Sequence, residues 1–265
     1  MTEFICIGVP YWLGSKADYT GSVEVLRASG IAEELNAEWV DIAPDFDAVA
    51  DPLIAVNRAL AAAIRAHSDK LALIFAGDCT SCLGAVSGLA TKDPAIVWYD
   101  AHGDFNTPEI SISGFLGGMP LAALVGKGNQ HWMQGLGLSP LAERDVLITD
   151  VRDLDPDEAD LLHNSDVTVL TDVVDLMTAE LPQKPIYIHF DTDITHLDDL
   201  PAVSYPAVGG PHVDDILPTL ERLGREAKVA GALFTLWNNQ LPGAEKSMQS
   251  TMQFITALAQ ALQMR

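Results

Sequence analysis

The stretch Pro94-Ala95-Ile96-Val97-Trp98-Tyr99-Asp100-Ala101-His102-Gly103-Asp104-Phe105-Asn106-Thr107-Pro108 runs from an apolar segment directly into three metal-capable side chains. Its first half has the character of a buried parallel strand, and the glycine, asparagine and proline that follow predict a loop. Ligands of open α/β sheets bind just beyond the carboxyl ends of such strands. Asp100, His102 and Asp104 alternate there, so they can point at one place, and their donors suit Mn²⁺, Mg²⁺, Fe²⁺ or Zn²⁺. Taken alone, the pattern also fits an Asp-rich turn with a hydrogen-bonded histidine.

A second and a third strand end in the same way. The apolar run Ile186 to Phe190 leads into Asp191 and Asp193, and Leu71 to Ala76 leads into Gly77-Asp78-Cys79. Two strands that deliver five ligand-type residues at their carboxyl ends provide what a two-metal site needs, because bridging carboxylates come from more than one direction. Cys79 is a candidate to complete the cluster.

Strand-like and helical segments alternate along the whole chain, without an internal repeat or a low-complexity linker. We therefore predict one three-layer α-β-α domain over residues 1–265, with a mostly parallel, doubly wound sheet of about eight strands. The predicted strands are Phe4–Val9, Glu38–Ile42, Leu71–Ala76, Ile96–Tyr99, Val146–Val151, Val167–Leu170, Ile186–Phe190 and Val229–Leu236.

Local patterns predict the connections. Glu24 to Leu35 has helical spacing, and so does a shorter segment around Asp172 to Met177. Gly126 to Gly137 is expected to be a loop or a lid. Residues 194–212 are expected to form a long loop in which His196 and His212 either approach the metals or are solvated.

Composition narrows the classes of partner. The 265 residues hold 15 Lys plus Arg against 37 Asp plus Glu, a formal charge of −22, which predicts that the surface repels nucleic acid and anionic membranes. The same field attracts cations, although solubility alone also explains it. No segment approaches the roughly 20 apolar residues needed to cross a bilayer. Met1-Thr2-Glu3 leads into a strand-like run without a basic or long apolar leader, so we expect no signal peptide and a cytoplasmic protein.

Three cysteines, Cys6, Cys79 and Cys82, do not form a disulfide framework and agree with a reducing compartment. Cys79 and Cys82 make a Cys-x-x-Cys pair, but a redox role requires a thioredoxin-like setting and a closed zinc site requires two more ligands of similar kind. Cys82 is therefore interpreted as a packed residue on the following helix.

Together the motifs resemble the ureohydrolase family of arginases, agmatinases and formiminoglutamases over nearly the whole chain. The family's Gly-Gly-Asp-His-Ser segment resembles Ala76 to Thr80, its Asp-Ala-His-x-Asp segment matches Asp100 to Asp104, and its Asp-x-Asp segment matches Asp191 to Asp193. The resemblance implies an arginase-like α/β fold and hydrolysis of a guanidino-type amino acid. It also carries the only expectation of oligomeric state, a homotrimer or homohexamer.

The resemblance further implies two Mn²⁺ ions that activate water for attack on a guanidino carbon. Asp100 and Asp191 would bridge the ions, Cys79 and Asp104 would complete one site, and His102 and Asp193 the other. Asp104 would also act catalytically by carrying a proton to the leaving nitrogen.

Three substrate-binding positions carry over from the arginase branch of the family. Asn106 and Ser113 would hold the substrate α-carboxylate, and Asp155 would help to hold the α-amino group. The residue types fit these roles, because Asn106 and Ser113 are neutral donors that can hydrogen-bond a carboxylate, and the carboxylate of Asp155 can accept from an ammonium group. In the alternative interpretation Asn106 and Ser113 form turns and Asp155 begins a helix ahead of Pro156.

Three departures from the family pattern bear on the substrate. Cys79 stands where most members have a histidine ligand, so its site is expected to hold Mn²⁺ weakly or to take another divalent ion. Gly117 stands where arginases have a proton-shuttling histidine, and Leu236 where they have a glutamate near the guanidinium. General acid-base help contributes ~10² to 10⁴ in rate, so we expect poor activity on an unactivated guanidinium.

A narrower resemblance, in residues 102–109 and 116–119 and in Cys79, is to family members that hydrolyse Nω-hydroxy-L-arginine. An N-hydroxyguanidine is less basic than a guanidinium, so the missing carboxylate matters less. Arginine itself ranks lower. The alternatives are agmatinase-type or formiminoglutamase-type activity, and a degenerate member of the family that only binds its ligand.

Overall fold

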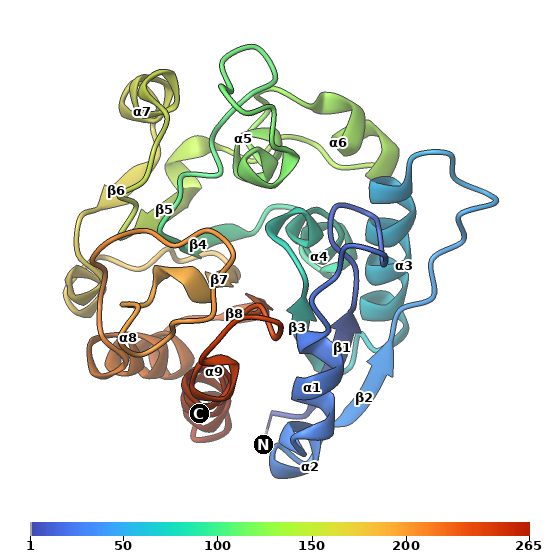
Figure 1. Cartoon of the computed structure of the whole chain (residues 1–265), viewed down its shortest axis with the longest axis vertical. Coiled ribbons are helices and arrows are strands. Elements are labelled where there is room, and N and C mark those ends of the chain that lie inside the picture. Colours follow the sequence, from blue (N-terminus) through green and yellow to red (C-terminus); the bar gives the residue numbers. More distant parts are fainter. Residues whose placement is uncertain (1) are drawn as a thin grey trace.

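Within residues 2–265, eight parallel strands form one sheet in the order β2-β1-β3-β8-β7-β4-β5-β6 (Figure 1). The computed structural model describes residues 2–265. Met1, the first residue of the stretch from which we expected no signal peptide, lies outside them. The strands are β1 Phe4–Val9, β2 Glu38–Asp41, β3 Leu71–Ala76, β4 Ala95–Tyr99, β5 Val146–Thr149, β6 Thr168–Leu170, β7 Ile186–Asp191 and β8 Val229–Thr235. Their apolar runs agree with the predicted segments to within a few residues.

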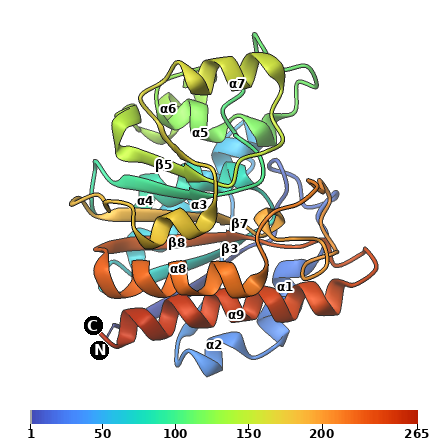
Figure 2. The ribbon, with the colours of Figure 1, turned by 90° about the vertical axis from the view of Figure 1, so that its left-hand side faces the viewer.

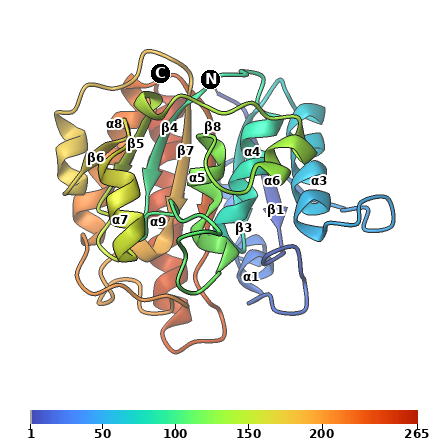
Figure 3. The same ribbon diagram turned by 90° about the horizontal axis from the view of Figure 1, so that it is seen from above.

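The strand order brings distant parts of the sequence together. After β3 the chain skips two positions to begin β4, and β8 and β7 later fill that gap. Because all strands are parallel, the loops after β3, β4, β7 and β8 emerge at the same edge of the sheet. Figure 3 shows that the C-terminus lies at the opposite end of the sheet.

Helices cover both faces of the sheet and make three layers (Figure 2). One apolar core lies between the sheet and α1 Ser22–Ala28, α2 Ile31–Glu34, α8 Val213–Glu226 and α9 Ala244–Gln263. The second lies under α3 Pro52–Ala66, α4 Cys82–Gly88, α5 Pro120–Leu124, α6 Gln130–Leu136 and α7 Pro156–His163. Burial on both faces explains why the central strands are apolar at most positions, with exceptions such as His189 in β7.

Helix boundaries follow local chemistry. Asp51 caps α3 by accepting from the amides of Leu53 and Ile54, at 2.9 and 3.3 Å, and Pro52 occupies the first turn. The segment predicted as one helix, Glu24 to Leu35, is instead two, because Gly30 adopts φ +86 between α1 and α2.

Two other predictions need correction. Gly126 to Gly137 is not an open lid: it contains α6, and its Trp132 and Met133 are buried in the core beside α3 and α4. The predicted helix near Asp172 is a 3₁₀ helix, η4 Val173–Met177. Among residues 2–265, no helix is long and apolar enough to cross a bilayer.

Candidate metal centre

The carboxyl edge of the sheet holds a cavity of about 420 Å³. Residues that follow β3, β4, β7 and β8 line it, and so do residues from the loops ahead of α5 and α7. All nine side chains that the sequence singled out contribute to its wall: Cys79, Asp100, His102, Asp104, Asn106, Ser113, Asp155, Asp191 and Asp193. Within the described part of the chain, no lysine or arginine is among the lining residues.

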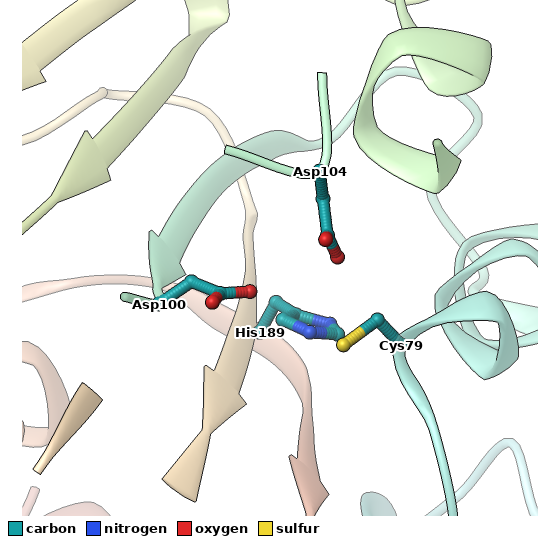
Figure 4. A group of neighbouring side chains, drawn as sticks. All are labelled: Cys79, Asp100, Asp104 and His189. Atoms are coloured by element: carbon teal, nitrogen blue, oxygen red, sulfur yellow. The ribbon is translucent and has the colours of Figure 1, made fainter. Parts of the chain in front are cut away.

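Two groups of possible ligands meet in this cavity. The ligand atoms of Cys79, Asp100, Asp104 and His189 all lie within 4.8 Å of one another, and those of Asp100, His102 and Asp193 form a second such group. Figure 4 shows the first group converging from separate segments. Asp100 belongs to both groups, so its carboxylate lies between the two.

The second group is held by ion-pair contacts of His102 with two carboxylates. His102 Nδ1 lies 3.1 Å from Asp193 Oδ2 and 3.5 Å from Asp100 Oδ1. Asp191 belongs to neither group, but its Oδ2 accepts from the Cys79 thiol at 3.0 Å and its Oδ1 accepts from the Asp193 amide at 2.9 Å. The ends of β3, β4 and β7 are therefore linked at one point.

Local structure explains how these side chains are positioned. Asp78, buried at the end of β3, accepts from the amides of Leu13 and Thr80 at 2.6 and 2.7 Å and so fixes the turn that carries Cys79. Asp104 adopts a left-handed conformation, φ +48, which aspartate tolerates better than most residues. The preceding Gly103 lies so close to α7 that a Cβ there would be 2.6 Å from Glu158 Oε1.

The acidic cluster lacks compensating charge. Burial, followed by repulsion from nearby carboxylates such as Asp100, raises the pKa of Asp104 and of Asp193 well above the ordinary range. Burial and the same carboxylate raise the pKa of Asp191. The thiol pKa of Cys79 is raised well above its usual value by burial and by Asp104, Asp191 and Asp100.

One imidazole supplies part of the missing charge. Burial disfavours the charged form of His102, but the carboxylates of Asp100 and Asp193 outweigh it and raise its pKa to about 12. Among residues 2–265, the buried Oδ2 of Asp104 still has no hydrogen-bond partner. Buried anions require pairing with cations, and thiolate, carboxylate and imidazole are donors for divalent metals, so this cluster fits a metal centre.

The substrate-side residues form a network of their own. Asn106 Nδ2 donates to Asp155 Oδ2 and Glu158 Oε2, each at 3.1 Å, while the buried Asn106 Oδ1 has no partner in the part of the chain that the structure describes. Asp155 and Glu158 also make a capping box at the start of α7. Ser113 is exposed, and its Oγ accepts from the Phe115 amide at 3.1 Å. Asp155 therefore begins α7, as the alternative interpretation expects, and it also lines the cavity; its role in substrate binding stays a prediction.

An aromatic wall stands at the cavity near Gly117. Phe115 packs between Trp12 and Tyr205, with ring centroids 6.1 and 5.0 Å away. A Cβ at Gly117 would overlap the Phe115 ring, so that ring occupies the space a longer side chain would need. Leu236 lines the same cavity directly after β8.

The sequence interpretation missed two cavity-side residues. Glu158 was hidden in a helical pattern, although its position three residues after Asp155 is a capping signal. His189 was counted as part of an apolar strand, and only its place two residues before Asp191 could have suggested a shared face. His196 and His212 lie away from the cavity: their ring centroids are 4.5 Å apart with the planes tilted by 32°, and His212 Nδ1 is 2.8 Å from Asp199 Oδ2.

A three-layer α/β fold with a carboxylate-rich centre beyond its parallel strands defines the class of metal-binding α/β proteins. Residues 17–255 match the model of the arginase family. The chain is 30% identical to the arginase of Bacillus caldovelox over 286 residues, which covers 93% of this chain and 94% of that protein. It is 30% identical to the arginase of Bacillus subtilis over 203 residues, 71% of this chain and 69% of that one. This chain belongs to the arginase family.

Solved structures agree with this assignment. The arginase of Bacillus cereus superposes with a TM-score of 0.87 at 25% identity, over 98% of each chain. The protein is accordingly a hydrolase that acts on amidines, in a family whose members hydrolyse guanidino compounds and depend on two metal ions.

Proposed function

We propose that this enzyme hydrolyses an amino acid with an N-hydroxylated or similarly activated guanidino group, releasing a urea analogue. The observation that carries the proposal is the Phe115 ring beside Gly117. It fills the space for the histidine that arginases place there, so the cavity offers no proton shuttle at that point. The substrate must then need less acid-base help than arginine does.

The second support comes from Leu236, which lines the cavity where arginases have a glutamate. A carboxylate there favours a charged guanidinium, and a leucine does not. An N-hydroxyguanidine is less basic and can bind as the neutral species. These features, together with Cys79, resemble the Nω-hydroxy-L-arginine amidinohydrolase of D-cycloserine biosynthesis.

In this proposal Cys79 and Asp104 would hold one divalent cation and His102 and Asp193 would hold another, with Asp100 and Asp191 available to both. Two Mn²⁺ ions are the expectation from the family, with a different ion possible at Cys79. When bound, such cations lower the pKa of water and polarise the guanidino carbon.

The chain's own residues then move protons and orient the substrate. Asp104, whose Oδ2 has no partner among the described residues, accepts a proton from the attacking water and delivers it to the departing nitrogen. The C–N bond to the amino-acid side chain breaks, giving hydroxyurea and a diamino acid. Asp155 accepts from the substrate ammonium, and Ser113 and Asn106 contact its carboxylate.

The resting network adds one requirement. Both hydrogens of the Asn106 amide already bond to Asp155 and Glu158, so the substrate carboxylate must take one of them over. An ammonium that draws Asp155 away from Asn106 would free that donor. The α-amino and α-carboxyl groups therefore bind together, which disfavours agmatine, a substrate without a carboxylate.

The test is a product screen of the Mn²⁺-loaded enzyme with arginine, Nω-hydroxyarginine, agmatine, guanidinobutyrate and formiminoglutamate. We expect the highest kcat/KM with hydroxyarginine. Faster hydrolysis of arginine would refute the proposal, and no turnover of any of them would favour a degenerate binding protein. Cys79→His, measured beside wild type, tests the ligand assignment, because a harder ligand should improve turnover with Mn²⁺.

A further inference from the structure

His189 is a fully buried histidine one row below the metal-type carboxylates. It lies on β7 directly opposite Trp98 of β4, and the two rings stack with centroids 3.5 Å apart and planes 8° apart. Its Nδ1 is 3.3 Å from the hydroxyl of Tyr187. Its Nε2 is buried and has no hydrogen-bond partner within residues 2–265.

An orphaned polar atom in a protein interior calls for an explanation, because desolvation without a partner is unfavourable. Here the ring offers a nitrogen within 4.8 Å of Cys79 Sγ and of carboxylate oxygens of Asp100 and Asp104. Figure 4 shows the His189 ring between Asp100 and Cys79, with Asp104 approaching from the other side. Ligand atoms around one tetrahedral ion stand about 3 to 4 Å apart, so a small contraction closes this set.

We propose that His189 Nε2 is a ligand of the cation at the Cys79 site. This inference rests on the proposed metal centre and extends its ligand set. Position 79 carries a thiol where most of the family has an imidazole, and His189 supplies an imidazole to the same site from another strand.

With His189 added to the proposed set, the donors are one thiolate, one imidazole and the three carboxylates of Asp100, Asp104 and Asp191. Thiolate is a soft ligand, and this mixture suits a borderline ion such as Zn²⁺, Co²⁺ or Fe²⁺ better than Mn²⁺. The group around His102 has only an imidazole and carboxylates, so it remains the harder site. The two positions are therefore expected to select different metals.

A packing role for His189 is the competing explanation, since the Trp98 stack and the Tyr187 contact could justify the ring alone. The substitution His189→Phe separates the two, because phenylalanine keeps an aromatic ring against Trp98 but carries no ligand atom. His189→Gln is a second variant, in case the first does not fold. His163→Phe, on the exposed surface of α7, is the matched control.

The experiment measures metal binding by the metal-free protein. Co²⁺ titration reports the thiolate through sulfur-to-cobalt charge transfer, and competition with a chromophoric chelator gives the Zn²⁺ affinity. For wild type and His163→Phe we expect Zn²⁺ to bind more tightly than Mn²⁺, with charge transfer that is lost in Cys79→Ser and kept in Cys82→Ser. His189→Phe and His189→Gln should bind Zn²⁺ more weakly and show a shifted Co²⁺ spectrum. The loss of Zn²⁺ affinity should exceed the ~10- to 100-fold loss that follows removal of a residue that only hydrogen-bonds to a metal ligand.

Unchanged affinity and cobalt spectrum in both His189 variants would overturn the inference, as would a wild type whose thiolate binds no Zn²⁺ or Co²⁺. Hydrolysis is measured separately. If His189 variants lose metal while wild type turns over no guanidino compound, the proposed function fails and the ligand assignment stands. If wild type hydrolyses hydroxyarginine and His189 variants keep both metals, the ligand assignment alone fails.

Discussion

Trp98 Nε1 donates to Asp100 Oδ2 at 3.0 Å, and the ring of the same tryptophan stacks on His189. One buried side chain thus orients the carboxylate that both groups of ligands share. Partners of this kind fix the direction of a ligand's lone pairs, so their loss weakens metal binding without removing a donor.

Trp98→Phe should therefore lower divalent-metal affinity by about 10- to 100-fold while the protein stays folded. Isothermal titration of the metal-free protein with Mn²⁺ and Zn²⁺ measures this. Trp39→Phe is the control, because Trp39 Nε1 donates to Asp41 Oδ1 at 2.8 Å on β2, away from the cavity. Equal losses in the two variants would count against a positioning role for Trp98.

Gly117→His alone should not create an efficient arginase, because the Phe115 ring occupies the required space. The double variant Gly117→His with Phe115→Ala opens that space, and we expect its kcat for arginine to exceed wild type by at least about tenfold, part of the ~10² to 10⁴ available from acid-base help. Steady-state kinetics on arginine and hydroxyarginine measure it, with Phe115→Ala as control. A gain in Phe115→Ala equal to that of the double variant would contradict the explanation.

Asp104→Asn should have opposite effects on the metal-free and metal-loaded protein. In the native metal-free state the pKa of Asp104 is raised, so the folded protein disfavours the ionised carboxylate. Ionisation of Asp104 therefore costs no stability below the pKa of the unfolded chain, and this cost grows as the pH rises above that value. Near pH 8 the metal-free variant should therefore unfold at a higher denaturant concentration than wild type. Its thermal shift on adding Mn²⁺ should be smaller. A metal-free variant less stable than wild type near pH 8 would argue against the repulsive cluster.

Glu158 gives a pH dependence of its own. Burial raises its pKa to about 7 from an ordinary 4.5, although amides of Phe105 and Asp155 donate to it. The folded state therefore binds the Glu158 proton more tightly than the unfolded chain does. The resulting contribution to the free energy of unfolding, roughly 3 kcal/mol, is fully present below pH 4.5 and is lost as the pH rises to about 7.

Glu158→Gln, which cannot titrate, should flatten the fall in urea-unfolding free energy of the metal-free protein across this interval. Glu143→Gln is the control, because the pKa of Glu143 is lowered, by hydrogen bonds from Lys127 and the Asp166 amide that outweigh its partial burial. An unchanged slope in Glu158→Gln would show that Glu158 titrates normally.

Asp199 and His212 tie the long loop after β7 to the start of α8. The hydrogen bond between them lowers the pKa of Asp199 and raises that of His212. The contribution of Asp199 to folding stability is present above the pKa of aspartate in the unfolded chain, and it is lost as the pH falls through the lowered pKa of the folded state. The contribution of His212 to folding stability is present below the pKa of histidine in the unfolded chain, and it is lost as the pH rises through the raised pKa of the folded state.

Asp199→Asn should therefore cost most stability between about pH 4 and 6.5, with a smaller difference from wild type on either side. Denaturant midpoints across this range measure it. The amide oxygen can still accept from the Val213 amide, so the variant isolates the charge. A loss of the same size at all pH values would indicate packing instead of an ion pair.

The strands could be predicted from the sequence because parallel strands buried on both faces must be apolar throughout, and Phe4–Val9 and Leu71–Ala76 are such runs. The short helices were harder. Gly30 breaks a helical pattern by its backbone conformation, and α6 lies in a segment whose buried Trp132 and Met133 resemble loop residues until α3 and α4 are placed beside them. Such contacts are long-range, so no local pattern encodes them.

The same division applies to the centre. Asp100, His102 and Asp104, and Asp191 and Asp193, were recognisable because polar residues that alternate directly after an apolar strand must point to one side of its end. Whether the two strands are neighbours depends on β8 and β7 filling the gap beside β4, which only the tertiary structure decides.

The sequence by itself determined the alternation of strands and helices, the acidic character of the chain and the residue types at the strand ends. Only the tertiary structure placed His189 beside Cys79 and the Phe115 ring beside Gly117. The physical reason is that chain order specifies which side chains a strand carries and on which face, whereas their neighbours across the sheet depend on packing between segments far apart in sequence.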